Sequence, residues 1–160
     1  VADRAKAAGV ALSMELVNRY ETNLMNTVKQ GLAYIRDTGS DNLFLHIDTF
    51  HMNIEEGDMG QAIRLAGGRI GYFHVGESNR GYLGSGSIDF APVFDALVAI
   101  GYQKVISVEA FNTQGCGDWL KAICAIWREN WTDADAFALT SLDFMRAQWD
   151  EAQRRAAAYR

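Results

Sequence analysis

The chain contains little of what several protein classes require. Only two of its 160 residues are cysteines, Cys116 and Cys124, and they fit neither a disulfide framework nor a CxxC metal site. We therefore expect two free thiols in a reducing compartment and a cytoplasmic protein. No apolar run approaches the ~20 residues of a transmembrane helix. No signal peptide is recognisable, and because the first residue is Val1 rather than Met, an upstream part is expected to be missing.

Basic clusters are also absent. The formal net charge is -5, and no block of Lys or Arg offers a surface for nucleic acid or membrane. We expect neither partner. What the chain does have is apolar material: 49% of its residues are hydrophobic and 22% are charged, which is the profile of a globular protein with a substantial core.

Apolar runs and amphipathic segments alternate along the sequence. Apolar residues recur at helical spacing before a glycine stop, as in the segment that ends at Gly39. The predicted strands are 10–14, 43–47, 70–75 and 105–109, and the predicted helices are 23–37, 59–66, 90–100, 119–127 and 134–158. Near-continuous apolar strands that alternate with helices predict a parallel sheet covered by helices.

Each predicted strand ends at or near a residue that can bind a metal. These residues are Glu15, Asp48, His74 and Glu109. In parallel β/α folds the carboxyl ends of the strands carry the active site. One such residue is more often a cap or a loop anchor, but one on each of four strands is hard to ascribe to chance. Three carboxylates and one imidazole favour Mn²⁺, Mg²⁺ or Co²⁺ over structural zinc.

This set of ligands suggests a chemistry. A hexacoordinate ion would keep about two positions for neighbouring substrate oxygens, and an α-hydroxy ketone supplies such a pair. A metal on the carbonyl stabilises the enediolate that forms when the adjacent proton leaves, and a carboxylate must take that proton. Glu15 and Glu109 lie on the first and last predicted strands, so in a closed barrel they would face opposite sides of the enediolate. Proton removal on one side and return on the other inverts the carbon.

Four sequence motifs carry a family resemblance. The stretches ELVNRYETNLMNT (15–27), HIDTFHMNIEE (46–56), FHVGESNRGYLGSGSIDF (73–90) and VISVEAF (105–111) resemble the C-terminal half of the D-tagatose 3-epimerase / D-psicose (allulose) 3-epimerase family. That family belongs to the xylose-isomerase-like TIM barrels. The resemblance implies an α/β fold in which residues 1–160 form one domain half, the C-terminal four units of a (β/α)8 barrel. A whole barrel needs ~250 residues.

The resemblance also implies roles for individual residues. Glu15, Asp48, His74 and Glu109 match the family's ligands for Mn²⁺ or Co²⁺, and Glu15 and Glu109 match its acid/base pair. The residues that match positions holding the ketose oxygens are Glu21, His51 and Arg80. A small-molecule ketose is the implied substrate, and a homo-oligomer is expected at full length.

More ordinary interpretations of the same residues stay open. Glu21 could be an early-helix carboxylate, His51 could bond a loop carbonyl, and Arg80 could form a surface ion pair with Glu77. His46 is predicted to point away from the site as a structural histidine.

Other functions also remain. They are a hydroxypyruvate isomerase-like or inosose dehydratase-like enzyme, and a non-catalytic sugar-binding half-barrel. An endonuclease IV type nuclease is disfavoured, because three histidines are too few for a multinuclear zinc site and the charge is acidic.

Overall fold

A four-stranded parallel sheet organises the computed structural model, which describes residues 1–158. The strands follow one another in chain order, β1-β2-β3-β4, and every neighbouring pair is parallel. Their bounds are Leu12–Glu15 for β1, Leu43–Asp48 for β2, Ile70–Val75 for β3 and Ile106–Val108 for β4. The predicted parallel α/β fold is therefore confirmed, and all four strands point their carboxyl ends to the same edge.

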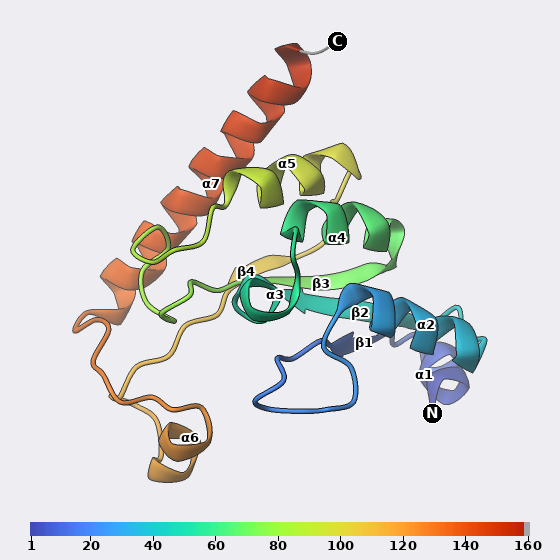
Figure 1. The fold of residues 1–160 in the computed structure, drawn as a ribbon, viewed down its shortest axis with the longest axis horizontal. Coiled ribbons are helices and arrows are strands. Elements are labelled where there is room, and N and C mark those ends of the chain that lie inside the picture. The colour runs from blue at the N-terminus through green and yellow to red at the C-terminus, as the bar shows by residue number, and fades with distance from the viewer. Residues whose placement is uncertain (159–160) are drawn as a thin grey trace.

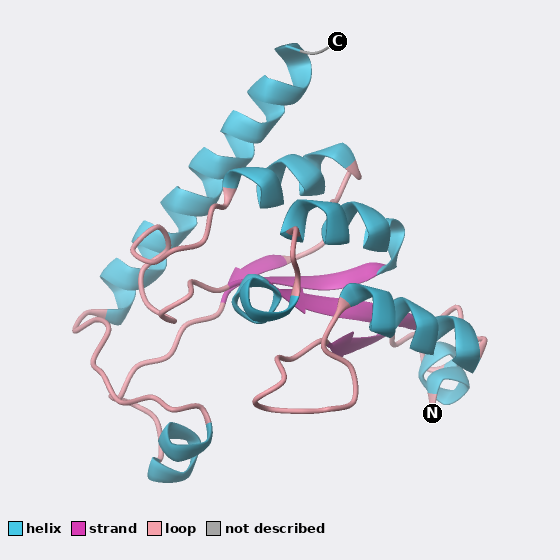
Figure 2. Ribbon diagram, in the orientation of Figure 1, coloured by secondary structure: helices cyan, strands magenta, loops and turns pink. Residues whose placement is uncertain are grey.

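Helices return the chain from each strand to the next (Figures 1 and 2). Their bounds are Ala2–Ala7 (α1), Val28–Thr38 (α2), Thr49–Glu55 (α3), Met59–Ala66 (α4), Ala91–Ala99 (α5), Asp118–Ile123 (α6) and Ala134–Ala158 (α7), with a 3-10 turn at Gly67–Arg69. In Figure 1, α2, α4 and α5 lie along one face of the sheet, and α7 packs on α5. Within residues 1–158, no helix combines the length and apolarity that crossing a bilayer requires.

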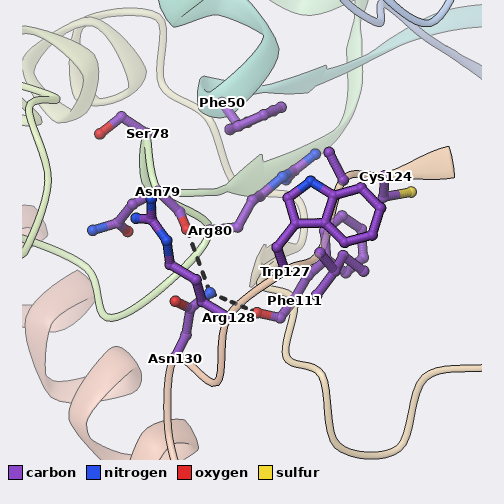
Figure 3. Close-up of a pocket in the computed structure, with 11 residues that line it drawn as sticks. Phe50, Ser78, Asn79, Arg80, Phe111, Cys124, Trp127, Arg128 and Asn130 are labelled. Atoms are coloured by element: carbon purple, nitrogen blue, oxygen red, sulfur yellow. Dashed lines mark hydrogen bonds between the residues drawn. The ribbon is translucent and has the colours of Figure 1, made fainter. Parts of the chain in front are cut away.

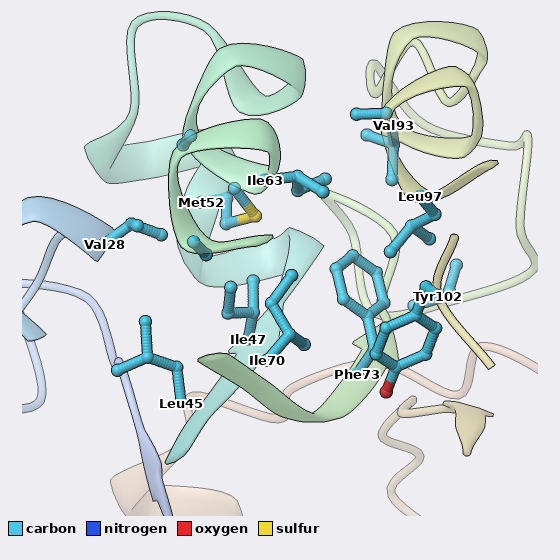
Figure 4. Packing of buried hydrophobic residues seen from close by; sticks show 14 of the residues in the cluster. Val28, Leu45, Ile47, Met52, Ile63, Ile70, Phe73, Val93, Leu97 and Tyr102 are labelled. Carbon is cyan, nitrogen blue, oxygen red and sulfur yellow. The ribbon is translucent and has the colours of Figure 1, made fainter. Parts of the chain in front are cut away.

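The core fills the space between the sheet and this helical layer (Figure 4). Alternate residues of β2, including Leu45 and Ile47, are fully buried there. Gly31 allows α2 to approach the sheet, because a Cβ at this position would lie 2.8 Å from side-chain atoms of both Leu16 and Leu45. The residues of β2 that alternate with Leu45 and Ile47 point to the opposite face of the sheet. That face carries the polar side chains, so the sheet separates an apolar layer from a polar one.

The start of α2 differs from the sequence prediction. We expected a helix from residue 23, but α2 begins at Val28, after an N-cap at Thr27. Thr27 and Gln30 form a reciprocal capping box, which satisfies backbone N–H groups at the helix end. Residues 16–26 instead form a loop, in which the Asn26 side chain donates to the carbonyls of Val17 and Thr22. These hydrogen bonds keep residues 16–26 beside the carboxyl ends of the strands.

Smaller differences concern the other elements. The strand predicted at 105–109 is limited to Ile106–Val108, and the helix predicted at 119–127 to Asp118–Ile123. Two helices were not predicted, α1 and α3. The latter begins directly after β2, because an Asp48 carboxylate oxygen accepts a hydrogen bond from the Phe50 N–H at 2.9 Å and caps the helix. A strand-end carboxylate thus also starts the next helix.

Candidate active site

The sheet topology brings the predicted carboxylates together. Glu15 is the last residue of β1, Asp48 is the last residue of β2, and Glu109 follows β4 directly. His74 is the fifth residue of β3 and pairs in register with Asp48. Oxygens of all three carboxylates and a ring nitrogen of His51 lie within 4.8 Å of one another. The three carboxylates predicted on separate strands therefore form one cluster at the carboxyl edge of the sheet.

Arg80 lies at the centre of this cluster. Its Nη1 donates at 2.7 Å to Asp48 Oδ2 and at 2.7 Å to Glu109 Oε2. Its guanidinium carbon lies 3.7 Å from the centre of the Phe50 ring and 4.8 Å from that of Phe111. The buried guanidinium is thus fixed by two carboxylates and two aromatic faces.

The backbone at Arg80 is held in an uncommon conformation. Its φ of 57° lies in the left-handed region, which a non-glycine residue rarely adopts. The Arg80 N–H donates to the Glu77 carbonyl, and the Arg80 carbonyl accepts from the Phe111 N–H. The alternative of a surface ion pair with Glu77 is wrong. The buried Glu77 carboxylate accepts instead from the N–H groups of Ser78 and Gly86, so it fixes the loop that follows β3.

Burial and charge push the pKa values of the carboxyls apart. Burial raises the pKa of Asp48 to about 7, although the charge of Arg80 opposes this shift. Burial and the neighbouring Glu109 charge raise the pKa of Glu15. Burial also acts upward on Glu109, but a hydrogen bond with Asp48 and the charges of Arg80 and His74 lower its pKa overall. At neutral pH Glu109 therefore holds its negative charge most firmly.

His51 projects from α3 into the same cluster. Its Nδ1 accepts from the backbone N–H of Asn18 at 3.1 Å and lies 2.9 Å from the Asn18 side-chain Nδ2. Its Nε2 lies 3.9 Å from Glu15 Oε1 and 4.0 Å from Asp48 Oδ2. Burial and the charge of Arg80 lower the pKa of His51 to about 4, so the ring is neutral. The alternative that His51 bonds a loop carbonyl is wrong, because the loop supplies an N–H.

Glu21 lies at the rim of the cluster, in a turn rather than in a helix. Its Oε1 accepts from Asn18 Nδ2 at 2.9 Å and lies 3.9 Å from His51 Nδ1. About a third of the side chain, 36%, is exposed. The early-helix interpretation of Glu21 is therefore wrong, and the side chain lies beside the other predicted site residues.

The prediction for His46 was also wrong. Residues two apart in a strand share a face, so His46 points to the same side as Asp48. Its ring packs edge-on against His74, with centroids 4.3 Å apart, and its Nδ1 lies 3.9 Å from Glu15 Oε2. Its Nε2 is buried without a hydrogen-bond partner among residues 1–158. His46 therefore belongs to the polar layer beneath the carboxylates.

The cluster fits a divalent cation. The four predicted ligands, however, do not all lie within one group of neighbouring ligand atoms. The groupings within 4.8 Å are Glu15 with Asp48, His51 and Glu109, and Glu15 with His46 and His74. His74 shares Glu15 with the first group, and its Nδ1 lies 3.6 Å from Glu109 Oε1. That nitrogen is buried and has no hydrogen-bond partner within residues 1–158. Three carboxylates beside an unpartnered imidazole nitrogen are a donor set that suits Mn²⁺, Mg²⁺ or Co²⁺.

A cavity of about 280 Å³ opens beside Arg80 (Figure 3). Phe50 and Phe111 line it together with Arg80 and with residues 124–128 and Asn130. Trp127 borders this cavity and is 70% exposed. The site is therefore open to a small molecule on the side of Arg80.

The comparisons with known proteins identify the family. A family model described as a xylose isomerase-like TIM barrel matches residues 1–148. The chain belongs to this family. The resemblance in the four motifs is thereby confirmed, together with a TIM-barrel type of α/β fold. Family members share the fold without sharing one reaction, so the activity must be argued from the site.

Several relatives that cover nearly all of this chain are named as sugar epimerases. An L-ribulose 3-epimerase from Mesorhizobium japonicum is 56% identical over 156 residues, which are 98% of this chain and 52% of the relative. A D-psicose 3-epimerase from Agrobacterium fabrum is 37% identical over 161 residues, 99% of this chain and 51% of the relative. A solved structure of an L-ribulose 3-epimerase matches with a TM-score of 0.96 at 56% identity, over 99% of this chain and 53% of that chain. The chain spans about half the length of the curated relatives it matches.

Proposed function

We propose that residues 1–160 are the C-terminal four β/α units of a barrel enzyme that epimerises a ketose at C3. The similar relatives are named as 3-epimerases and are about twice as long as this chain, and both facts support the proposal. One observation carries it: Glu15, which ends the outer strand β1, and Glu109, which directly follows the outer strand β4, converge on a single cluster with Asp48. Epimerisation needs such a pair, because one group must remove a proton and another must return one to the opposite face.

The proposed metal ligands are Glu15, Asp48, His74 and Glu109. Their oxygen-rich composition favours Mn²⁺, with Co²⁺ or Mg²⁺ as substitutes. The buried His74 Nδ1, which has no hydrogen-bond partner within residues 1–158, supports its place in the set. The ion, when bound, polarises the ketose carbonyl and lowers the cost of removing the adjacent proton.

Glu15 and Glu109 are the proposed acid/base pair. The lowered pKa of Glu109 suits a carboxylate that accepts the C3 proton, and the raised pKa of Glu15 suits a carboxyl that donates one. Pairs of carboxyls whose surroundings push their pKa values apart commonly divide the two roles in this way. In the reverse direction the roles exchange, since both epimers are substrates of the same equilibrium.

The proposed substrate contacts are Glu21, His51 and Arg80. Arg80 borders the open cavity and is fixed by two carboxylates, so its remaining N–H groups can meet a ketose oxygen. Glu21 lies at the rim beside the buried His51, with its Oε1 3.9 Å from His51 Nδ1. A hydroxyl-rich ligand needs both donors and acceptors at fixed positions, and these three side chains supply them.

The test uses a full-length parent of this chain. It is incubated with Mn²⁺ and a panel of ketoses in D₂O, and deuterium incorporation is followed by NMR. We expect deuterium at C3 together with formation of the C3 epimer. Deuterium at C1 with aldose formation would instead indicate an aldose–ketose isomerase, and water loss would indicate a dehydratase. Absence of exchange at full metal occupancy would favour a sugar-binding half-barrel. Sizing of the same sample tests the proposed homo-oligomer.

A further inference from the structure

We propose that Asn18 is a positioning residue that holds His51 with its proton on Nε2 and aims Glu21 beside it. The two side chains would then present a hydrogen-bond donor and an acceptor to the substrate. The first half of this proposal concerns the chain alone. The second half rests on the proposed epimerase function.

The tautomer follows from the contacts of His51 Nδ1. A backbone N–H can only donate, and that of Asn18 points at Nδ1 from 3.1 Å. The Asn18 side-chain Nδ2 lies 2.9 Å from the same nitrogen. The orientation of this amide is fixed, because its Oδ1 accepts from the Tyr20 N–H at 2.9 Å, and so Nδ2 faces His51. Two donors on Nδ1 require a lone pair there, and a neutral imidazole then carries its proton on Nε2.

The surroundings of Nε2 contain both acceptors and a donor. Carboxylate oxygens of Glu15 and Asp48 lie 3.9 and 4.0 Å away, and their negative charge favours a proton on Nε2. The Arg80 Nη2 lies 3.4 Å from Nε2. A guanidinium can only donate, so this contact opposes a proton on Nε2, and the two shorter contacts at Nδ1, of 2.9 and 3.1 Å, decide the tautomer. The lone pair of His51 on Nδ1 is therefore occupied by the Asn18 donors and not free for a cation, which leaves Glu15, Asp48 and Glu109 as the ligating members of their group.

Asn18 also determines how Glu21 is presented. The Asn18 Nδ2 donates to Glu21 Oε1 at 2.9 Å, and within residues 1–158 no donor bonds the other oxygen, Oε2. Asn18 itself is buried, and its backbone N–H and both polar groups of its side-chain amide are engaged with Tyr20, Glu21 and His51. The side chain therefore links a donor, His51 Nε2–H, to an acceptor, Glu21 Oε2. Such a pair is complementary to adjacent carbonyl and hydroxyl groups of a ketose.

The test of the tautomer is a long-range ¹H–¹⁵N NMR spectrum of the metal-free full-length parent of this chain. His51 is assigned by comparison with His51→Gln. We expect a protonated Nε2 and an unprotonated Nδ1 in the wild type. In Asn18→Asp, a carboxylate replaces the Nδ2 donor, and we expect the proton to move to Nδ1 or both nitrogens to be protonated. Asn18→Ala keeps the backbone donor and should keep the wild-type tautomer. Asn53→Asp adds the same charge on the exposed side of α3 and should change nothing.

A wild-type His51 with its proton on Nδ1 would overturn the proposal. An Asn18→Asp spectrum identical to the wild type would overturn the role of the side chain.

A kinetic test uses the full-length enzyme. There Asn18→Asp should lower kcat/KM by about 10- to 100-fold, which is the usual effect of losing a residue that orients a functional side chain. The Mn²⁺ affinity should stay unchanged, and Asn53→Asp should not lower kcat/KM. Unchanged kcat/KM in Asn18→Asp with normal C3 exchange in the wild type would reject the positioning role and leave the epimerase function standing. Absence of C3 exchange in the wild type would reject the function and leave the tautomer intact.

Discussion

The Asp48 carboxyl is the most buried group of the proposed metal site. A metal that binds only the folded chain stabilises it by mass action, by about 2.7 kcal/mol at a concentration of 100 Kd. Mn²⁺ or Co²⁺ should therefore raise the Tm of the wild type. Asp48→Asn should remove most of that gain, because an amide oxygen carries no charge for the ion, and His74→Ala should do the same. Thermal unfolding with and without the metal measures the shift.

A matched control for this substitution exists on α4. Asp58 also caps a helix, by accepting from the Gln61 N–H at 2.8 Å, but it does not belong to the ligating groups. Asparagine can replace aspartate in both caps at little cost. Asp58→Asn should therefore keep the full metal shift. If Asp48→Asn and His74→Ala also keep it, the assignment of the metal site is wrong.

Glu109 is proposed to act both on the metal and on the C3 proton. In the full-length enzyme, Glu109→Gln should lower turnover by at least about 100-fold, because general acid–base catalysis contributes on that scale. Metal occupancy must be measured in the same sample, since the carboxylate serves both roles. Glu151→Gln, an exposed change on α7, should have no effect. Normal epimerisation by Glu109→Gln at full occupancy would exclude the acid/base assignment.

The individual site residues differ in how far the sequence reveals them. Glu15, Asp48 and Glu109 could be found because each terminates an apolar run, and parallel strands bring their ends together. Asn18 could not be found in this way. Its role depends on a loop that turns its backbone N–H and its amide toward a helix 33 residues later. The position of His46 could have been predicted from the sequence, because the two-residue alternation of a strand places it on the same face as Asp48.

Among the secondary-structure elements, α2 shows how caps decide boundaries. Its apolar spacing extends back to Leu24, yet the helix starts only after Thr27. A threonine followed three residues later by a glutamine is a capping box, and this local signal outweighs the periodicity. The consequence is functional, because the residues that stay outside the helix form the loop that carries Asn18 and Glu21. Loops positioned by a rigid scaffold are the usual location of binding residues.

The capping box gives a prediction at this scale. Thr27→Ala removes the side-chain acceptor for the Gln30 N–H and should lower the free energy of unfolding by about 1 kcal/mol. Thr27→Ser keeps a hydroxyl at the same position and should restore most of the loss. Urea unfolding of both variants at a fixed metal concentration measures the difference. Equal losses in the alanine and serine variants would mean that the methyl group, rather than the cap, stabilises this helix end.

At the scale of the whole molecule, the sheet has two outer strands with a free edge each within residues 1–158. These strands are β1 and β4. In a closed eight-stranded barrel both would pair with further strands. Here the residues just before them, Val10 and Val105, are 53% and 57% exposed. Apolar side chains beside an unpaired strand edge favour pairing with another chain. The fold class was readable from the alternation of strands and helices, but the closure of the barrel depends on strands beyond these residues.

We therefore expect the 160-residue chain to associate or aggregate in solution and to show weak or no epimerase activity. The metal should still bind, since Glu15, Asp48, His74 and Glu109 all belong to the chain. Catalysis should suffer, because water reaches the polar face of an open sheet and weakens the electrostatic stabilisation of an enediolate.

The measurement compares this chain with a version extended at its N-terminus to the length of its relatives, by sizing and by deuterium exchange at C3. The extended version should be monodisperse and exchange deuterium faster by orders of magnitude, about 100-fold or more if general acid–base catalysis is lost in the short chain. A monodisperse monomer of the 160-residue chain with the exchange rate of the extended one would show that four β/α units suffice for the chemistry.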